Sequence, residues 1–149
     1  MLKIEKLRPQ DISEVVAISE QQFGAHGWRN DLFVAEIDKE NHFAFVAKLD
    51  QKVVAFLFIM KTFGEKGEDF NILNIATKKG FENRGIGTEM FLFLRNFSKC
   101  LDIDYLWLEV RENNLNAIKF YENLGFVVDY TRKNYYANGD NAIVMSCKI

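Results

Sequence analysis

The sequence has little proline, cysteine and histidine: its 149 residues include one Pro, two Cys and two His. A single proline argues against a proline-rich linker or a disordered tail. The two cysteines have no Cys-x-x-Cys spacing, and neither histidine has a carboxylate or cysteine at ligand spacing, so no metal site is expected. We expect Cys100 and Cys147 to be reduced packing residues, and His26 and His42 to be loop or surface residues.

Long apolar runs and an excess of one charge are also missing. No apolar segment approaches the ~18 residues that a membrane span needs, and the first residues are too charged for a secretory signal. The net charge of −2 provides no basic excess for nucleic acid. We therefore expect a cytoplasmic protein that binds neither membrane nor nucleic acid.

Hydrophobic residues, by contrast, make up 48% of the sequence and include 14 Phe. This is enough for a sizeable core rich in aromatic rings, and the length predicts a single domain, 1–149. Helix and strand patterns follow the order β-αα-βββ-α-β-α-ββ, which predicts an α/β (α+β) fold. The predicted strands are Ile4–Leu7, Phe43–Leu49, Val53–Lys61, Phe70–Thr77, Asp104–Val110, Phe126–Tyr130 and Ala142–Lys148.

Four helices complete this pattern. The first begins at Asp11, a candidate N-cap with Glu14 three residues on, and ends before Gly24. The second runs from Asn30 or Asp31 to about Glu40, the third from Gly85 to about Lys99, and the fourth from Asn113 or Asn114 to Asn123. Gly125 closes the fourth helix, and turns are predicted at 50–52, 64–68 and 138–140.

The stretch from Asn71 to Met90 has the pattern of a strand, a short loop and a helix start. After an apolar run, Gly85 and Gly87 open a segment whose apolar residues fall at helical spacing. Glycines at the mouth of a helix let backbone N–H groups point outward, where the helix dipole helps them bind an anion such as a diphosphate. Arg84 adds positive charge. The alternative is a tight turn with ordinary glycines.

Two better-known phosphate loops do not fit this stretch. A P-loop needs Gly-Lys-Ser/Thr, which is absent. The Rossmann fingerprint needs a third glycine where Met90 stands, and it normally occupies the first βα turn of a chain.

A carboxylate lies near the end of the strand that begins at Tyr105. The period of two places Tyr105, Trp107 and Glu109 on one face. Burying a carboxylate in an apolar strand is unfavourable unless it is paired or used in chemistry. Glu109 is therefore either a partner of Arg111 or a candidate general base.

In the helix that follows, Asn114 and Tyr121 share one face at a spacing of i, i+7. The phenol of Tyr121 offers a proton, and the alternative is a core tyrosine whose hydroxyl reaches the rim. Together with a base and a diphosphate site, such an acid supplies the parts of an acyl transfer from a nucleotide thioester.

These motifs resemble the GNAT (Gcn5-related N-acetyltransferase) superfamily. Asn83-Arg-Gly-Ile-Gly87 after a strand matches that family's acetyl-CoA pyrophosphate loop, and the run from Arg111 to Phe126 matches its second motif. The element order also fits, so the resemblance covers nearly the whole chain. It implies a GNAT fold with a mixed central sheet of about seven strands, about four flanking helices, and a splay at the cofactor site.

Within the superfamily the chain is most similar to the ribosomal-protein alanine N-acetyltransferase (RimI-like) branch. Four runs carry that similarity: Asn74-Ile-Ala76, Leu106–Arg111, Arg132–Tyr136 and Asp140–Met145. One position departs from the family loop, which usually has Gln or Arg three residues before its first glycine. Here that residue is Glu82, and a carboxylate beside a diphosphate is unfavourable unless it points away.

The resemblance implies direct acetyl transfer from acetyl-CoA to a primary amine, with no metal. Glu109 is then the general base and Tyr121 the acid. Tyr135 and Tyr136 border the amine site, and Trp28 is either a core residue or a wall of the acceptor cleft. The cofactor-binding residues are Ile75, Ala76, Thr77, Asn83, Arg84, Gly85, Ile86, Gly87, Thr88 and Asn114.

Three functions remain open at this point. The acceptor is the N-terminal α-amine of a protein such as a ribosomal protein, or it is a small-molecule amine or polyamine, for which Glu36, Asp38 and Glu40 would supply charge. A non-catalytic acetyl-CoA-binding module is the third. For the enzyme we expect a monomer or weak homodimer.

Overall fold

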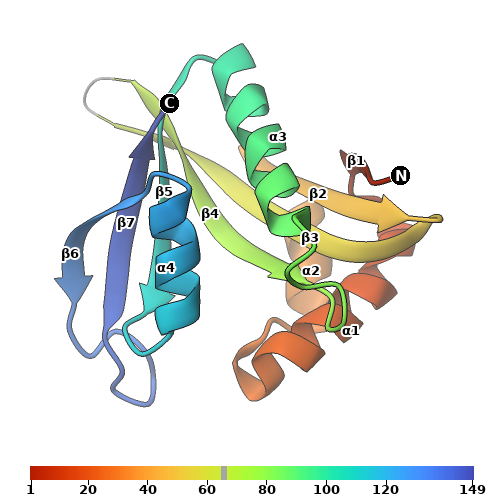
Figure 1. Cartoon of the computed structure of the whole chain (residues 1–149), viewed down its shortest axis with the longest axis horizontal. Helices are drawn as coiled ribbons and strands as arrows, with labels where there is room; N and C mark the ends of the chain where they lie inside the picture. The colour runs from red at the N-terminus through yellow and green to blue at the C-terminus, as the bar shows by residue number, and fades with distance from the viewer. Residues whose placement is uncertain (65–66) are drawn as a thin grey trace. The chain divides into compact units, whose positions relative to one another are not determined.

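The computed structural model describes residues 1–64 and 67–149, and in this part it contains a seven-stranded mixed sheet and four α-helices (Figure 1). The strand order is β1-β2-β3-β4-β5-β7-β6. The strands are β1 (Lys3–Lys6), β2 (His42–Leu49), β3 (Lys52–Phe63), β4 (Glu68–Thr77), β5 (Ile103–Arg111), β6 (Val127–Arg132) and β7 (Ala142–Lys148). The helices are α1 (Ile12–Phe23), α2 (Asn30–Ile37), α3 (Ile86–Cys100) and α4 (Leu115–Asn123). The predicted fold class is thus confirmed.

The parallel part of the sheet is the pair β4 and β5. Its register runs from Glu68 opposite Ile103 to Ile72 opposite Leu108. Both strands continue further, β4 to Thr77 and β5 to Arg111. The predicted splay of these continuing ends stays a prediction. The pairs β1–β2, β2–β3, β5–β7 and β6–β7 are antiparallel.

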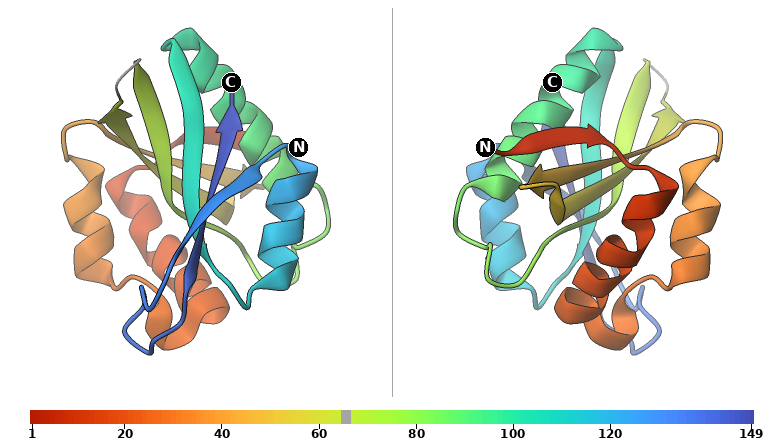
Figure 2. Two further views of the ribbon diagram at one scale, coloured as in Figure 1. Left: turned by 90° about the vertical axis from the view of Figure 1, so that its left-hand side faces the viewer. Right: turned by 90° about the vertical axis from the view of Figure 1, so that its right-hand side faces the viewer.

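The described chain divides into two compact units, which we call unit 1 (1–60 and 74–94) and unit 2 (61–73 and 95–149). The core of unit 1 includes a cluster of aromatic rings from α2, β3 and the segment before α2. Helices α1 and α2 lie side by side (Figure 2). Trp28 packs against Phe33 and Phe58 with ring centroids 5.3 and 5.4 Å apart. Both Phe rings are fully buried. The expected ring-rich core is present here.

In unit 2 the core lies between β5, β7 and the C-terminal part of α3. Phe70 and Phe97 stack at 5.8 Å, and six of the seven residues of β7 are buried. On β5 the buried side chains alternate with outward-facing ones. One outward side chain, Trp107, donates a hydrogen bond from its Nε1 to Asp69 Oδ2 at 2.9 Å.

The start of α1 differs from the predicted capping box. Asp11 precedes the helix, but its carboxylate does not cap it; Oδ2 instead accepts a hydrogen bond from the backbone N–H of Arg8 at 2.9 Å. Glu14 accepts from the backbone N–H of Val53 at 2.9 Å, so it fastens α1 to β3. Asp11 thus caps the short 3-10 helix Pro9–Asp11 that precedes α1, and Glu14 has a donor distant in sequence.

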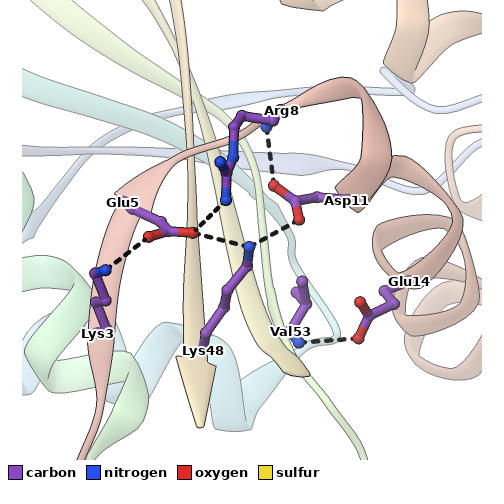
Figure 3. A network of polar contacts seen from close by, with 7 residues as sticks. All are labelled: Lys3, Glu5, Arg8, Asp11, Glu14, Lys48 and Val53. Atoms are coloured by element: carbon purple, nitrogen blue, oxygen red, sulfur yellow. Dashed lines mark hydrogen bonds and ion pairs between the residues drawn. The ribbon is translucent and has the colours of Figure 1, made fainter. Parts of the chain in front are cut away.

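Asp11 belongs to an ion network that ties β1, β2 and the start of α1 together (Figure 3). Lys48 Nζ lies 2.8 Å from Glu5 Oε1 and 2.9 Å from Asp11 Oδ1. Its side chain is 11% exposed, and that of Asp11 is 4% exposed. We call Lys48, Glu5 and Asp11 the Lys48 network.

Tight turns are present at two of the positions that the sequence predicted. Asp50 and Gln51 both have positive φ, 49° and 66°, in the tight connection where Leu49 pairs with Lys52. In the predicted turn at 64–68, the N–H of Gly64 donates to the carbonyl of Gly67 at 2.7 Å, and residues 65–66 lie outside the described residues.

The expectations for cysteine and histidine were right for one residue of each pair. Cys147 is buried, but Cys100 at the end of α3 is exposed, because it falls outside the apolar stripe of that helix. His26 is exposed as expected. His42 instead begins β2 and contacts buried Glu36.

Candidate active site

The glycine loop of unit 1 connects β4 to α3 over residues 78–85. Asn83 and Gly85 have φ of 60° and 79°, a conformation that favours glycine and tolerates asparagine. A Cβ at Gly85 would meet nothing within 4 Å, so the backbone there faces open space. The first helical hydrogen bond joins the N–H of Glu89 to the carbonyl of Gly85, which leaves the preceding amides of the first turn for a ligand.

Positive charge beside the loop is held by an aromatic ring. The guanidinium of Arg84 lies 4.9 Å from the centroid of Phe81, and Lys78 Nζ lies 5.8 Å from it. The backbone N–H of Lys78 donates to the carbonyl of Val54 at 2.7 Å, which fixes the start of the loop to β3. A helix N-terminus flanked by two cations is suited to bind an anion.

A residue that sequence reasoning missed lies against this loop. Gln22, in the last turn of α1, donates from Nε2 to the carbonyl of Thr77 at 2.8 Å and to Glu82 Oε1 at 2.6 Å. These partners are 55 and 60 residues away, so no local pattern identifies the contact. Glu82, the departure from the family loop, is therefore hydrogen-bonded to α1.

The other predicted cofactor residues of unit 1 are contiguous with the loop. Ala76 is buried in β4, and Ile75 and Thr77 beside it are half-buried. Ile86 is the buried first residue of α3, followed by half-buried Gly87 and exposed Thr88. The strand end, the loop and the helix start thus form one continuous segment.

In unit 2, Glu109 lies on the outward face of β5, as the period of two predicts. Its side chain is 33% exposed, so its carboxylate is not a buried charge. Oε1 lies 3.6 Å from Arg132 Nε, and a side-chain hydrogen bond to Glu109 raises the pKa of Tyr135. Arg111, the alternative partner from the sequence, forms an ion pair with Asp140 instead, at 3.0 Å.

Two tyrosine rings, each with an arginine over it, lie near this carboxylate. The rings of Tyr135 and Tyr136 are 5.2 Å apart and nearly perpendicular, at 82°. Arg111 lies over Tyr136 at 3.8 Å, and Arg132 lies over Tyr135 at 5.7 Å. Burial raises the pKa of Tyr136. We call Glu109, Arg132 and Tyr135 the Glu109 cluster; the structure brings its predicted base and one predicted acceptor residue into contact.

The other two predicted residues of unit 2 belong to α4. Asn114 is the N-cap, because its Oδ1 accepts from the N–H of Ala117 at 3.2 Å, and its Nδ2 donor is not used by the cap. Tyr121 packs edge-on against Phe120 and Phe126, with centroids 5.5 and 5.6 Å apart. Burial raises the pKa of Tyr121 to about 12, so its phenol stays protonated at neutral pH.

Trp28, the remaining predicted residue, is half-buried in the ring cluster of unit 1. This agrees with the core alternative, and a role toward an acceptor stays a prediction. In residues 1–64 and 67–149 there is no group of three or more His, Cys, Asp or Glu that could hold a metal. None of the helices in these ranges is long and apolar enough to cross a membrane.

Comparison with curated proteins finds relatives over the length of this chain. The [ribosomal protein bS18]-alanine N-acetyltransferase of Escherichia coli is 30% identical over 152 residues, which cover all of this chain and 99% of that protein. The N-alpha-acetyltransferase 30 of Xenopus laevis is 32% identical over 143 residues, 96% of this chain. These are 48% of that protein, so the chain spans less than half of its length.

Solved structures show the same fold. The crystal structure of the ribosomal-protein-S18-alanine N-acetyltransferase from Escherichia coli superimposes with a TM-score of 0.84 at 28% identity, covering 100% of this chain and 94% of that chain. The structure of Arabidopsis thaliana NAA60 in complex with acetyl-CoA has a TM-score of 0.88 at 14% identity, covering 100% and 99%, and is a likeness of fold. The profile of the family described as "Acetyltransferase (GNAT) family" matches residues 12–126. The chain therefore belongs to the acetyltransferase (GNAT) family, as its motifs predicted.

Proposed function

We propose that the chain is an acetyl-CoA-dependent N-acetyltransferase that moves an acetyl group directly to the N-terminal α-amine of a protein. The observation that carries the proposal is the glycine loop, whose amides face open space at the start of α3 and which has Arg84 beside it. The names of the relatives support a protein N-terminus as the acceptor.

The loop would hold the diphosphate of acetyl-CoA. Its ligands are the backbone amides from Asn83 to Thr88, reinforced by the dipole of a 15-residue helix. The strand edge at Ile75 and Ala76 would pair with the pantetheine arm, and an N–H there would stabilise the thioester oxygen as it becomes anionic. The carbonyl of Thr77 is already bonded to Gln22, so the arm pairs before that residue.

Glu109 would be the general base. An ammonium must lose a proton before it attacks the thioester carbon, and an exposed carboxylate can accept that proton directly or through a water. The new C–N bond forms as the C–S bond breaks, and the electron pair leaves on sulfur. Arg132 at 3.6 Å and the Tyr135 hydroxyl hold the carboxylate without enclosing it.

Tyr121 would stabilise the leaving thiolate. Its pKa of about 12 lies well above the ~8.5 of a free thiol. Complete proton transfer from this phenol to an ordinary thiolate is therefore uphill by about 5 kcal/mol. A hydrogen bond from the phenol to the developing charge is favourable, and transfer completes as burial raises the pKa of the thiol.

The domain organisation, oligomeric state and compartment of the enzyme are also proposed. We propose a single domain, 1–149, present as a monomer or weak homodimer. The cysteines form no disulfide in the described residues, which suits a reducing compartment such as the cytoplasm. Tyr135, a residue that is 52% exposed, would contact the acceptor peptide.

The small-amine alternative is less well supported. It relied on Glu36, Asp38 and Glu40 to attract a polyamine, and of these Asp38 and Glu40 are exposed. Glu36 is buried, with Lys39 Nζ 2.7 Å from its Oε1 and His42 against its Oε2, so its charge is already paired. The presence of both a candidate base, Glu109, and a candidate acid, Tyr121, counts against the non-catalytic alternative.

The test is thiol release from acetyl-CoA with a panel of amines. Peptides with free N-terminal Ala, Ser, Gly or Met would be compared with N-blocked forms, lysine side-chain peptides, spermidine and aminoglycosides. We expect turnover only with free N-termini. Turnover with spermidine or aminoglycosides alone would transfer the assignment to small amines, and cofactor binding without turnover on any acceptor would favour the non-catalytic module.

A further inference from the structure

We infer that Gln22 is a positioning residue for the coenzyme A diphosphate, because it holds the carboxylate of Glu82 away from the glycine loop's anion site. The inference rests on the proposed function, since it requires a coenzyme A at that loop. It also explains how this chain tolerates a carboxylate where the family usually has Gln or Arg.

The geometry of Gln22 shows that both protons of its side-chain amide are used. One bond reaches the carbonyl of Thr77, the last residue of β4, at 2.8 Å. The other reaches Glu82 Oε1 at 2.6 Å, a short hydrogen bond to a charged acceptor. A primary amide has two N–H donors, so one half-buried side chain joins the strand end to the start of the loop.

Electrostatics explain why this bond matters. Glu82 is exposed and lies three residues before Gly85. A carboxylate near the N-terminus of α3 is attracted by the same amides that would bind a diphosphate, and it repels that diphosphate. A side chain fastened to α1 cannot turn toward those amides.

The cations of the loop have other contacts. Arg84 and Lys78 lie over the ring of Phe81, at 4.9 and 5.8 Å. Gln22 therefore holds the Glu82 carboxylate, through a hydrogen bond that does not neutralise its charge. Loss of Gln22 would release an intact negative charge.

A purely structural role for Gln22 makes a different prediction. If the bond to Thr77 is what matters, losing Gln22 loosens the loop whether or not Glu82 is present. If restraint of Glu82 is what matters, removing Glu82 as well restores binding. A double-mutant cycle separates these cases.

The experiment measures the Kd of coenzyme A by titration calorimetry for wild type, Gln22→Met, Glu82→Ala and the double variant. Methionine keeps the length of the side chain and lacks the amide donors. Gln21→Met is the matched control, because Gln21 is the exposed neighbour on the same helix. We expect Gln22→Met to weaken binding by about fivefold, and Gln21→Met to leave Kd within about twofold of wild type.

Glu82→Ala should bind at least as tightly as wild type, and the double variant should match Glu82→Ala to within about twofold. The loss in Gln22→Met should also shrink between 0.05 and 0.5 M salt, because added ions screen repulsion between exposed charges. Circular dichroism checks that each variant is folded, and Gln22→Ala, which also lacks the amide donors, replaces Gln22→Met in the cycle if the latter does not fold.

Two results would overturn the inference: Gln22→Met equal to Gln21→Met, or a double variant as weak as Gln22→Met. Should Gln22→Met fail to fold, a Gln22→Ala/Glu82→Ala double variant as weak as Gln22→Ala would overturn it in the same way. If wild type itself does not bind coenzyme A, the proposed function fails and the inference fails with it. Binding by wild type with no effect of Gln22 removes the inference alone.

Discussion

The Lys48 network in unit 1 and the Glu109 cluster in unit 2 both pair a carboxylate with a basic side chain. They differ in the distance between the charged atoms and in how far the side chains are exposed. In the first, Lys48 lies within 2.9 Å of two carboxylates and its side chain is 11% exposed. In the second, Arg132 lies 3.6 Å from Glu109, and their side chains are 43% and 33% exposed. A closed network of short contacts contributes to stability, whereas an open pair leaves its carboxylate accessible to a substrate amine.

The largest effect is expected in the exposed Glu109 cluster. Glu109→Gln should lower kcat about 100-fold, because general bases contribute 10²–10⁴-fold. The loss should be largest at low pH, where the substrate amine is fully protonated. The measurement is the pH–rate profile with a free N-terminal peptide. Glu122→Gln, an exposed carboxylate of α4, is the control, and a wild-type profile for Glu109→Gln would remove Glu109 as the base.

A substitution in the Lys48 network should lower the free energy of unfolding and leave the catalytic rate unchanged. Lys48→Met leaves the carboxylate of Asp11, 4% exposed, without its ammonium partner. We expect the free energy of unfolding to fall by about 2 kcal/mol, with kcat unchanged. Urea denaturation followed by circular dichroism measures this. A stability equal to wild type would mean that the network contributes nothing net.

A third substitution tests the hydroxyl of Tyr121 in α4 as the hydrogen-bond donor to the leaving thiolate. Tyr121→Phe removes the hydroxyl and keeps the ring that packs between Phe120 and Phe126. We expect kcat to fall about tenfold with little change in the Kd of acetyl-CoA, because the missing hydrogen bond acts on the leaving thiolate. An unchanged kcat would exclude Tyr121 from the mechanism.

The closed network should also be visible in the pH dependence of stability. The hydrogen bond to Lys48 lowers the pKa of Glu5 below its ordinary 4.5, and the hydrogen bonds to Glu5 and Asp11 raise the pKa of Lys48 above 10.5. The Glu5 contribution is therefore lost as pH falls through its lowered pKa. The Lys48 contribution is lost as pH rises through its raised pKa. The stability difference between wild type and Lys48→Met should be flat between these limits, and a slope near pH 7 would contradict the assignment.

The smallest effect is expected for Arg132→Gln. The ion pair with Glu109 is long and exposed, so the free energy of unfolding should change by less than ~1 kcal/mol. Thermal unfolding measures this beside Lys48→Met. If Arg132→Gln lowered the free energy of unfolding as much as Lys48→Met, the two regions would contribute equally to stability.

Local features of the chain could be predicted from sequence. The fourth helix begins at an Asn114 cap and is followed by Gly125 at φ 102°, as its pattern predicted, because caps involve residues within one turn. The outward position of Glu109 followed from a period of two. The family loop was recognisable because its glycines and its strand are adjacent in sequence.

Choices among distant partners could not be predicted. Asp11 and Glu14 looked like capping residues of α1. Asp11 forms an ion pair with Lys48 on β2, and Glu14 accepts a hydrogen bond from Val53 on β3. Arg111 forms an ion pair with Asp140, which is 29 residues away in sequence. In each case several partners satisfy the local chemistry, and only the fold decides which is near.

The two tryptophans give this chain a built-in pair of optical reporters. Trp28 lies among Phe rings in unit 1, and Trp107 donates to Asp69 in unit 2, so their emission should differ in wavelength. Trp28→Phe and Trp107→Phe would each leave one indole reporting on one unit. Coincident denaturation curves from the two variants would mean that the units unfold cooperatively as one domain, and separate midpoints would give each unit its own stability.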